Sequence, residues 1–76
     1  MVAISGKTYD WRSILKNYGA RWVARDNVWV MTEERWNDLV SECVHGRNKR
    51  DRERNEAIRS WTVEPATEDQ IEAVAD

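Results

Sequence analysis

The sequence has 76 residues, and this length predicts one domain with a small core. It contains five Trp and two Tyr but no Phe, so indoles must supply most of the aromatic packing. The single cysteine, Cys43, excludes an internal disulfide, and one Cys with one His does not supply the ligands of a structural zinc site. We therefore expect no metal site and no cofactor.

The charges are strongly segregated along the chain, although the net charge is only −2. Residues 1–44 are neutral overall, residues 45–60 are basic, and residues 61–76 carry acidic side chains and no basic one. No apolar run is long enough to cross a membrane, and the N-terminus lacks a signal-peptide pattern. We expect a cytoplasmic protein with no membrane contact.

Residues 2–9 are expected to be extended, with a bend or a turn at Gly6. A helix over 10–18 follows, in which Asp10 is the expected N-cap and Gly19 the residue that ends the helix. The apolar residues of this helix recur at helical spacing and form one stripe: Trp11, Ile14, Leu15 and Tyr18.

Residues 19–31 predict a β-hairpin with a two-residue turn at Asp26-Asn27, since both residue types tolerate positive φ. This turn would place Trp22 opposite Met31 and Ala24 opposite Trp29. One face would then carry Trp22, Ala24, Trp29 and Met31, and the other Val23, Arg25, Val28 and Val30. The second face, with its exposed valines, would permit homodimerisation.

A second helix is predicted over 33–45, capped by Thr32 and with its acidic residues in the first turn. Its apolar stripe is Trp36, Leu39, Val40, Cys43 and Val44. Beyond it, the helix either stops at Gly46 or continues through it, and residues 48–60 are expected to be helical. Thr67 and Gln70 form a capping-box pattern before a short helix, although a disordered acidic tail is an equal alternative.

Together these elements predict a small α+β fold in which the extended segment and the hairpin form a three-stranded antiparallel sheet with helices on one face. The expected division is a Trp-rich α+β core at 1–45, a basic helical arm at 46–61 and an acidic tail at 62–76.

No catalytic group of residues is visible, so we expect a protein that is not an enzyme. Gly6-Lys7-Thr8 lacks the upstream glycine of a phosphate-binding loop. Cys43 and His45 are two residues apart on a helix and therefore point away from each other.

Two charged segments are candidate binding sites. In the basic arm, phosphate contacts are assigned to Arg47, Lys49, Arg50, Arg52 and Arg54. Lys7, Arg21 and Arg25 can extend that surface, and the alternative is a solvated helix with internal ion pairs. In the acidic tail, contacts to a protein partner are assigned to Trp61, Glu64, Glu68 and Asp69. The alternatives are that the tail shields the basic arm or is solvated, and that Trp61 anchors the arm within the molecule or a dimer.

The runs Gly6-Lys7-Thr8-Tyr9, Ile14-Leu15-Lys16 and Gly19-Ala20-Arg21-Trp22, followed by Trp29-Val30, carry a family resemblance. They resemble a small module of phage and mobile-element proteins, found alone or fused to primase-, topoisomerase- and helicase-like enzymes. The order of elements is also similar to that of the HARP domain of annealing helicases. The similarity covers residues 4–40. The family often has Asp or Asn where this chain has Val23, and a basic residue where it has Val28.

The resemblance implies an accessory role near DNA rather than a reaction. The leading hypothesis is therefore a small non-enzymatic binding protein, encoded by a phage or mobile element, that contacts nucleic acid or a nucleic-acid-processing complex. The alternative is an inhibitor or adaptor that binds a host enzyme through its acidic tail and Trp61.

Overall fold

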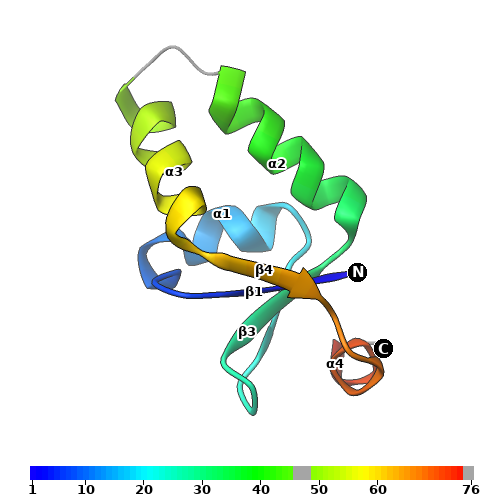
Figure 1. Ribbon diagram of the computed structural model, residues 1–76. Helices are drawn as coiled ribbons and strands as arrows, with labels where there is room; N and C mark the ends of the chain where they lie inside the picture. Colours follow the sequence, from blue (N-terminus) through cyan, green and yellow to red (C-terminus); the bar gives the residue numbers. More distant parts are fainter. Residues whose placement is uncertain (46–48, 75–76) are drawn as a thin grey trace.

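Four strands form one antiparallel sheet in the order β2-β3-β1-β4, and helices lie on both of its faces (Figure 1). The computed structural model describes residues 1–45 and 49–74. In chain order the elements are β1 (Val2–Ser5), the 3-10 helix η1 (Tyr9–Trp11), α1 (Arg12–Asn17), β2 (Arg21–Val23), β3 (Val28–Met31), α2 (Glu33–His45), α3 (Lys49–Ser60), β4 (Thr62–Pro65) and α4 (Glu68–Val74). The α+β class is confirmed.

The β2–β3 hairpin forms with a register that differs from the predicted one. Trp22 pairs with Trp29 and Val23 with Val28, so the connection is a four-residue loop over 24–27 rather than a two-residue turn. The Asp26 N–H bonds the Val23 carbonyl at 3.3 Å, and only Asn27 has positive φ, at 54°. A loop built this way is a common hairpin solution. Because the register moves by two residues, the strand side chains stay on their predicted faces, whereas Ala24 and Arg25 lie in the loop.

The prediction of three strands is wrong, because β4 adds a fourth. β1 lies between β3 and β4, with Ile4 paired to Trp29 on one side and to Val63 on the other. The predicted pairing of the N-terminal segment with the hairpin is confirmed, but the segment is extended only as far as Ser5. Gly6 then turns the chain with a φ of +124°.

The predicted helix over 10–18 is divided into η1 and α1, and Asp10 is not its N-cap. Asp10 lies inside η1, and neither helix has a side-chain hydrogen bond at its N-cap. The start of η1 is instead held by a backbone bond from the Trp11 N–H to the Thr8 carbonyl at 2.9 Å. Gly19, with a φ of +83°, follows the helix as predicted.

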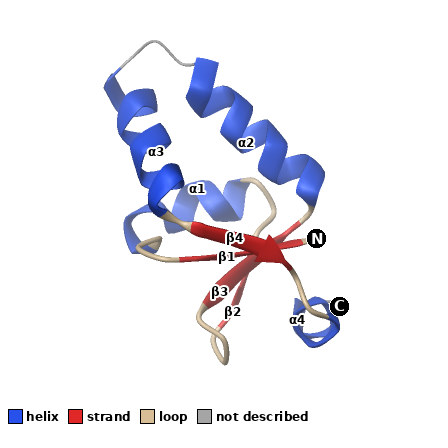
Figure 2. Cartoon of the chain, in the orientation of Figure 1, coloured by secondary structure: helices blue, strands red, loops and turns tan. Residues whose placement is uncertain are grey.

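Helices α2 and α3 pack against each other beside the sheet (Figure 2). The bounds of α2 match the prediction, and Thr32 accepts a hydrogen bond from the Arg35 N–H at 3.2 Å. Val44 departs from the predicted stripe, since it is 51% exposed. The alternatives at Gly46 and the predicted start of the next helix at residue 48 lie outside the described residues.

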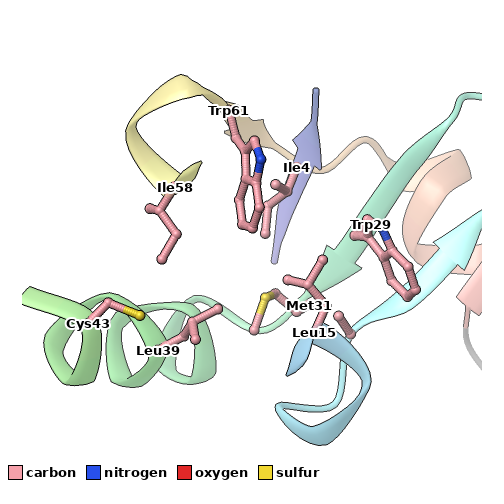
Figure 3. Packing of buried hydrophobic residues seen from close by; sticks show 9 residues of the cluster. Ile4, Leu15, Trp29, Met31, Leu39, Cys43, Ile58 and Trp61 are labelled. Carbon is pink, nitrogen blue, oxygen red and sulfur yellow. The ribbon is translucent and has the colours of Figure 1, made fainter. Parts of the chain in front are cut away.

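The larger core lies between the sheet and helices α1, α2 and α3. Ile4, Leu15 and Met31 are almost completely buried there. Ile58 of α3, and Trp61, which follows α3, belong to the same cluster and complete the core on the α3 side (Figure 3). The arm is therefore part of the core at its C-terminal end. Of the predicted stripe of the first helix, Leu15 is buried in this core, and Trp11, Ile14 and Tyr18 are half-buried and pack against it.

The opposite face of the sheet is covered by α4, so the expectation that helices cover one face is wrong. Ala3, Val23 and Val30 are buried there against Ala66 and Val74. The valine face expected to permit homodimerisation is consequently occupied by the same chain. The capping box that starts α4 is confirmed: the Thr67 N–H bonds Gln70 Oε1 at 3.0 Å, and the Gln70 N–H bonds Thr67 Oγ1 at 3.2 Å.

Replacing Trp61 with Ala is expected to destabilise the fold by about 3–5 kcal/mol, because its indole is 8% exposed and joins α3 to the sheet. Urea unfolding followed by circular dichroism measures the change. Val44→Ala, at an exposed position of α2, is the control and should change stability by no more than about 0.5 kcal/mol. Equal effects of the two substitutions would contradict this packing.

Candidate functional site

Two indole N–H groups hold the loop that joins β1 to η1. Trp29 Nε1 donates to Thr8 Oγ1 at 3.1 Å, and Trp61 Nε1 donates to the Lys7 carbonyl at 3.1 Å. A Cβ atom at Gly6 would stand 3.2 Å from Trp61 Cδ1, so the loop passes close to this ring. We call this arrangement of Trp29 and Trp61 on residues 6–8 the indole clamp. It fixes the backbone from which Lys7 and Tyr9 project.

Trp22 lies against Trp29 on the same face of the hairpin. The ring centroids are 5.3 Å apart and the planes are tilted by 56°. Trp29 is 4% exposed, whereas Trp22 is 46% exposed, so the inner indole supports an outer one that solvent can reach. Such aromatic pairs contribute about 0.5–1.5 kcal/mol beyond their buried area. The buried Trp29 ring thus supports the exposed Trp22 ring.

Trp22 forms one wall of a pocket of about 660 Å³. Its other walls are residues 6–10, Arg12, Lys16 and Trp29, and most of the lining is apolar. We call it the aromatic hollow. Its volume lies within the range of about 300–1,000 Å³ that is usual for pockets that bind small ligands.

Three cationic side chains and one carboxylate line the aromatic hollow. The basic residues are Lys7, Arg12 and Lys16, and the acidic one is Asp10, which leaves a local excess of two positive charges. The Arg12 guanidinium carbon lies 3.7 Å from the centroid of the Tyr9 ring, a cation–π contact. Tyr9 is nevertheless 73% exposed, so the hollow has an accessible ring from η1 as well as one from β2.

A second pocket, of about 540 Å³, adjoins the aromatic hollow. It is lined by Lys16, residues 19–22, Trp29, Ala73 and Val74, and we call it the α4 hollow. Lys16, Trp22 and Trp29 line both pockets, so the exposed indole of Trp22 lies where they meet.

Three of the predicted phosphate-binding residues, Lys49, Arg52 and Arg54, lie on α3 and line neither of these pockets. Lys49 and Arg52 are exposed. Arg54 is half-buried and, with Trp11 and Ile58, lines a small apolar pocket between α3 and the core. Arg47 and the side chain of Arg50 lie outside the described residues.

The residues expected to extend the basic surface lie elsewhere. Lys7 and Arg21 line the aromatic and α4 hollows, respectively. Arg25 lies in the β2–β3 loop, with its Nε 3.5 Å from an Asp26 carboxylate oxygen. The structure therefore groups Lys7 and Arg21 around Trp22 rather than with the basic arm.

The candidate partner-binding residues are also divided. Glu64 on β4, and Glu68 and Asp69 on α4, are exposed. Trp61 is buried and bonded to the Lys7 carbonyl, so the alternative in which it anchors the arm within the molecule holds for this side chain.

The described part of the chain contains no cluster of three or more His, Cys, Asp or Glu residues that could hold a metal ion. None of its helices is long and apolar enough to cross a membrane. Comparisons with protein-family models, curated proteins and solved structures find no match to this chain. The candidate site is therefore defined by its own chemistry, a hollow with exposed aromatic rings and cationic side chains.

Sequence reasoning missed Tyr9, Arg12, Lys16 and Trp22 as members of one site. A signal was present, since two aromatic and three basic residues lie close together in the sequence between Lys7 and Lys16. Periodicity assigned Trp22 to the interior, because residues on the same face as Trp29 are expected under the helices. The exposure of the side chains on this face depends on how far α1 extends over the hairpin. A sequence pattern does not determine that extent.

Thr8→Val is expected to destabilise the fold by about 1–3 kcal/mol, because it keeps the shape of the side chain but leaves the buried Trp29 N–H without its acceptor. Thr62→Val, at an exposed position of β4, makes the same chemical change and should shift stability by no more than about 0.5 kcal/mol. Urea unfolding measures both. Equal stability of the two variants would show that the Thr8 hydroxyl does not support the loop.

Proposed function

We propose that this chain is a small non-enzymatic binding protein that contacts nucleic acid through the aromatic hollow. The observation that carries the proposal is the meeting of two exposed rings, Tyr9 and Trp22, with three cationic side chains in one pocket. Nucleic acids present flat bases and regularly spaced negative phosphates, and proteins bind them with aromatic rings and basic side chains.

Charge segregation makes this proposal compatible with an acidic chain. The net charge of −2 would disfavour unspecific attraction to phosphate, but Lys7, Arg12 and Lys16 outnumber Asp10 at the hollow. The exposed acidic residues Glu64 and Glu68 lie on β4 and α4 and do not line the pocket. Local rather than net charge would set the attraction.

The exposed basic residues of α3 are proposed as a secondary phosphate contact. Trp61, directly after α3, bonds the Lys7 carbonyl, so the C-terminal end of α3 lies beside the loop that lines the hollow. Lys49 is at the far end of the helix, and acidic residues such as Glu53 alternate with the basic ones. This mixture of signs would partly offset the attraction of α3 for phosphate.

The resemblance of residues 4–40 to modules of phage and mobile-element proteins supports the same proposal, because the segment it covers includes Lys7, Tyr9, Arg12, Lys16 and Trp22. Arg47 and the other basic-arm residues lie outside it. An origin in a phage or mobile element is part of the proposal.

The double substitution Lys7→Glu/Lys16→Glu is expected to weaken binding to a DNA duplex with a single-stranded tail by about tenfold or more, because it reverses two of the cations at the hollow. Fluorescence anisotropy at several salt concentrations measures the affinity. In the unaltered protein, the logarithm of the association constant should fall linearly with the logarithm of the salt concentration. The expected slope is about −0.7 to −0.9 for each phosphate contacted.

Lys49→Glu/Arg52→Glu is the matched control, since it makes the same charge change at exposed positions of α3. A smaller loss of affinity than at the hollow is expected. A loss as large as that of the Lys7/Lys16 pair would place the main contact on α3. Absence of binding by the unaltered protein at low salt would reject the proposed function.

A further inference from the structure

We infer that the aromatic hollow and the α4 hollow together form a groove for single-stranded DNA, in which unpaired bases stack on Tyr9 and Trp22. This inference rests on the proposed function and specifies the form of nucleic acid that the site accepts. It is carried by the position of Trp22 between two pockets and by the cations that line them.

Exposed ring faces distinguish unpaired bases from paired ones. In a duplex both faces of a base are covered by its neighbours, so a protein ring can stack only on a base that has left the helix. Tyr9 and Trp22 are 73% and 46% exposed, respectively, and both line a concave surface.

Each ring already contacts a neighbouring side chain before a ligand arrives. Trp22 rests on the buried Trp29, whose N–H is bonded to Thr8. Tyr9 has the Arg12 guanidinium 3.7 Å from its centroid. Because these contacts already restrict the rings, binding a base costs less conformational entropy than it would with freely rotating side chains.

The cations lie where a bound strand would need them. Lys7 and Arg12 line the aromatic hollow, Arg21 lines the α4 hollow, and Lys16 lines both. Pockets of about 660 and 540 Å³ on either side of Trp22 can each receive a base, while Lys16 lies where the phosphate between them would pass.

The lining of the aromatic hollow favours DNA over RNA. Most of its wall is apolar. A 2′-hydroxyl, the group that distinguishes RNA, would lose hydrogen bonds to water when it is placed against this apolar wall.

The test compares labelled oligothymidylate, a blunt DNA duplex of the same length and oligouridylate by fluorescence anisotropy. The unaltered protein should bind oligothymidylate more tightly than either of the other two. Tyr9→Ala and Trp22→Ala should each weaken the binding of oligothymidylate by about 5- to 100-fold, the range expected for loss of one stacked base. Tyr9→Phe and Trp22→Phe should retain most of the affinity, because they keep an aromatic face.

Val44→Ala removes an exposed apolar side chain outside both pockets and should leave binding unchanged. Tyr9, at 73%, is more exposed than Trp22, so Tyr9→Ala tests stacking even if Trp22→Ala does not fold. Equal or tighter binding of the duplex or of oligouridylate would overturn the inference, as would alanine variants that bind like Val44→Ala.

The two proposals fail in different ways. If the tailed duplex binds with the expected dependence on salt and on Lys7 and Lys16, but oligothymidylate binds no better than the blunt duplex, the proposed function stands and the stacking groove is rejected. If the tailed duplex does not bind, both are rejected.

Discussion

Two indole N–H groups, from Trp29 and Trp61, connect the core of this protein to its candidate site. Each indole is buried in the same hydrophobic cluster, and each donates to the loop that follows β1. A buried N–H without an acceptor is costly, so the loop has to stay where Thr8 Oγ1 and the Lys7 carbonyl meet the two donors. The loop in turn positions Lys7 and Tyr9 at the edge of the aromatic hollow. Stability and the shape of the site therefore depend on the same pair of contacts.

The clamp also connects α3 and β4 to the core, since Trp61 lies between these two elements. Trp61 is the residue between α3 and β4, and β4 completes the sheet beside β1. The segment that the charge pattern separates as an arm is joined to the core by Ile58 and Trp61. After β4, the acidic segment crosses to the other face of the sheet. There α4 covers Val23 and Val30. A change of charge along a sequence thus does not mark a boundary in this fold.

Local sequence patterns were sufficient to predict helix α2 and to predict which hairpin side chains share a face. Thr32, the acidic first turn and the apolar stripe define α2, and alternation places Trp22 and Trp29 together whichever of two registers forms. The strand β4 was missed because all four of its residues are exposed and Pro65 ends it. β4 is held in an extended conformation by backbone pairing with β1. This long-range contact leaves no periodic signal in the side chains. The site was missed for a related reason, since the exposure of Trp22 and Tyr9 is set by tertiary packing.

The most direct test of the clamp is hydrogen exchange of the five Trp indole N–H groups, followed by two-dimensional NMR of the free protein. The Trp29 and Trp61 resonances should be strongly protected, because both N–H groups are hydrogen-bonded and both side chains are buried. The Trp22 resonance should be less protected than these two, in keeping with the greater exposure of its side chain. If Trp29 and Trp61 instead exchange as fast as Trp22, the loop is not held by the indoles and the account of both core and site is contradicted.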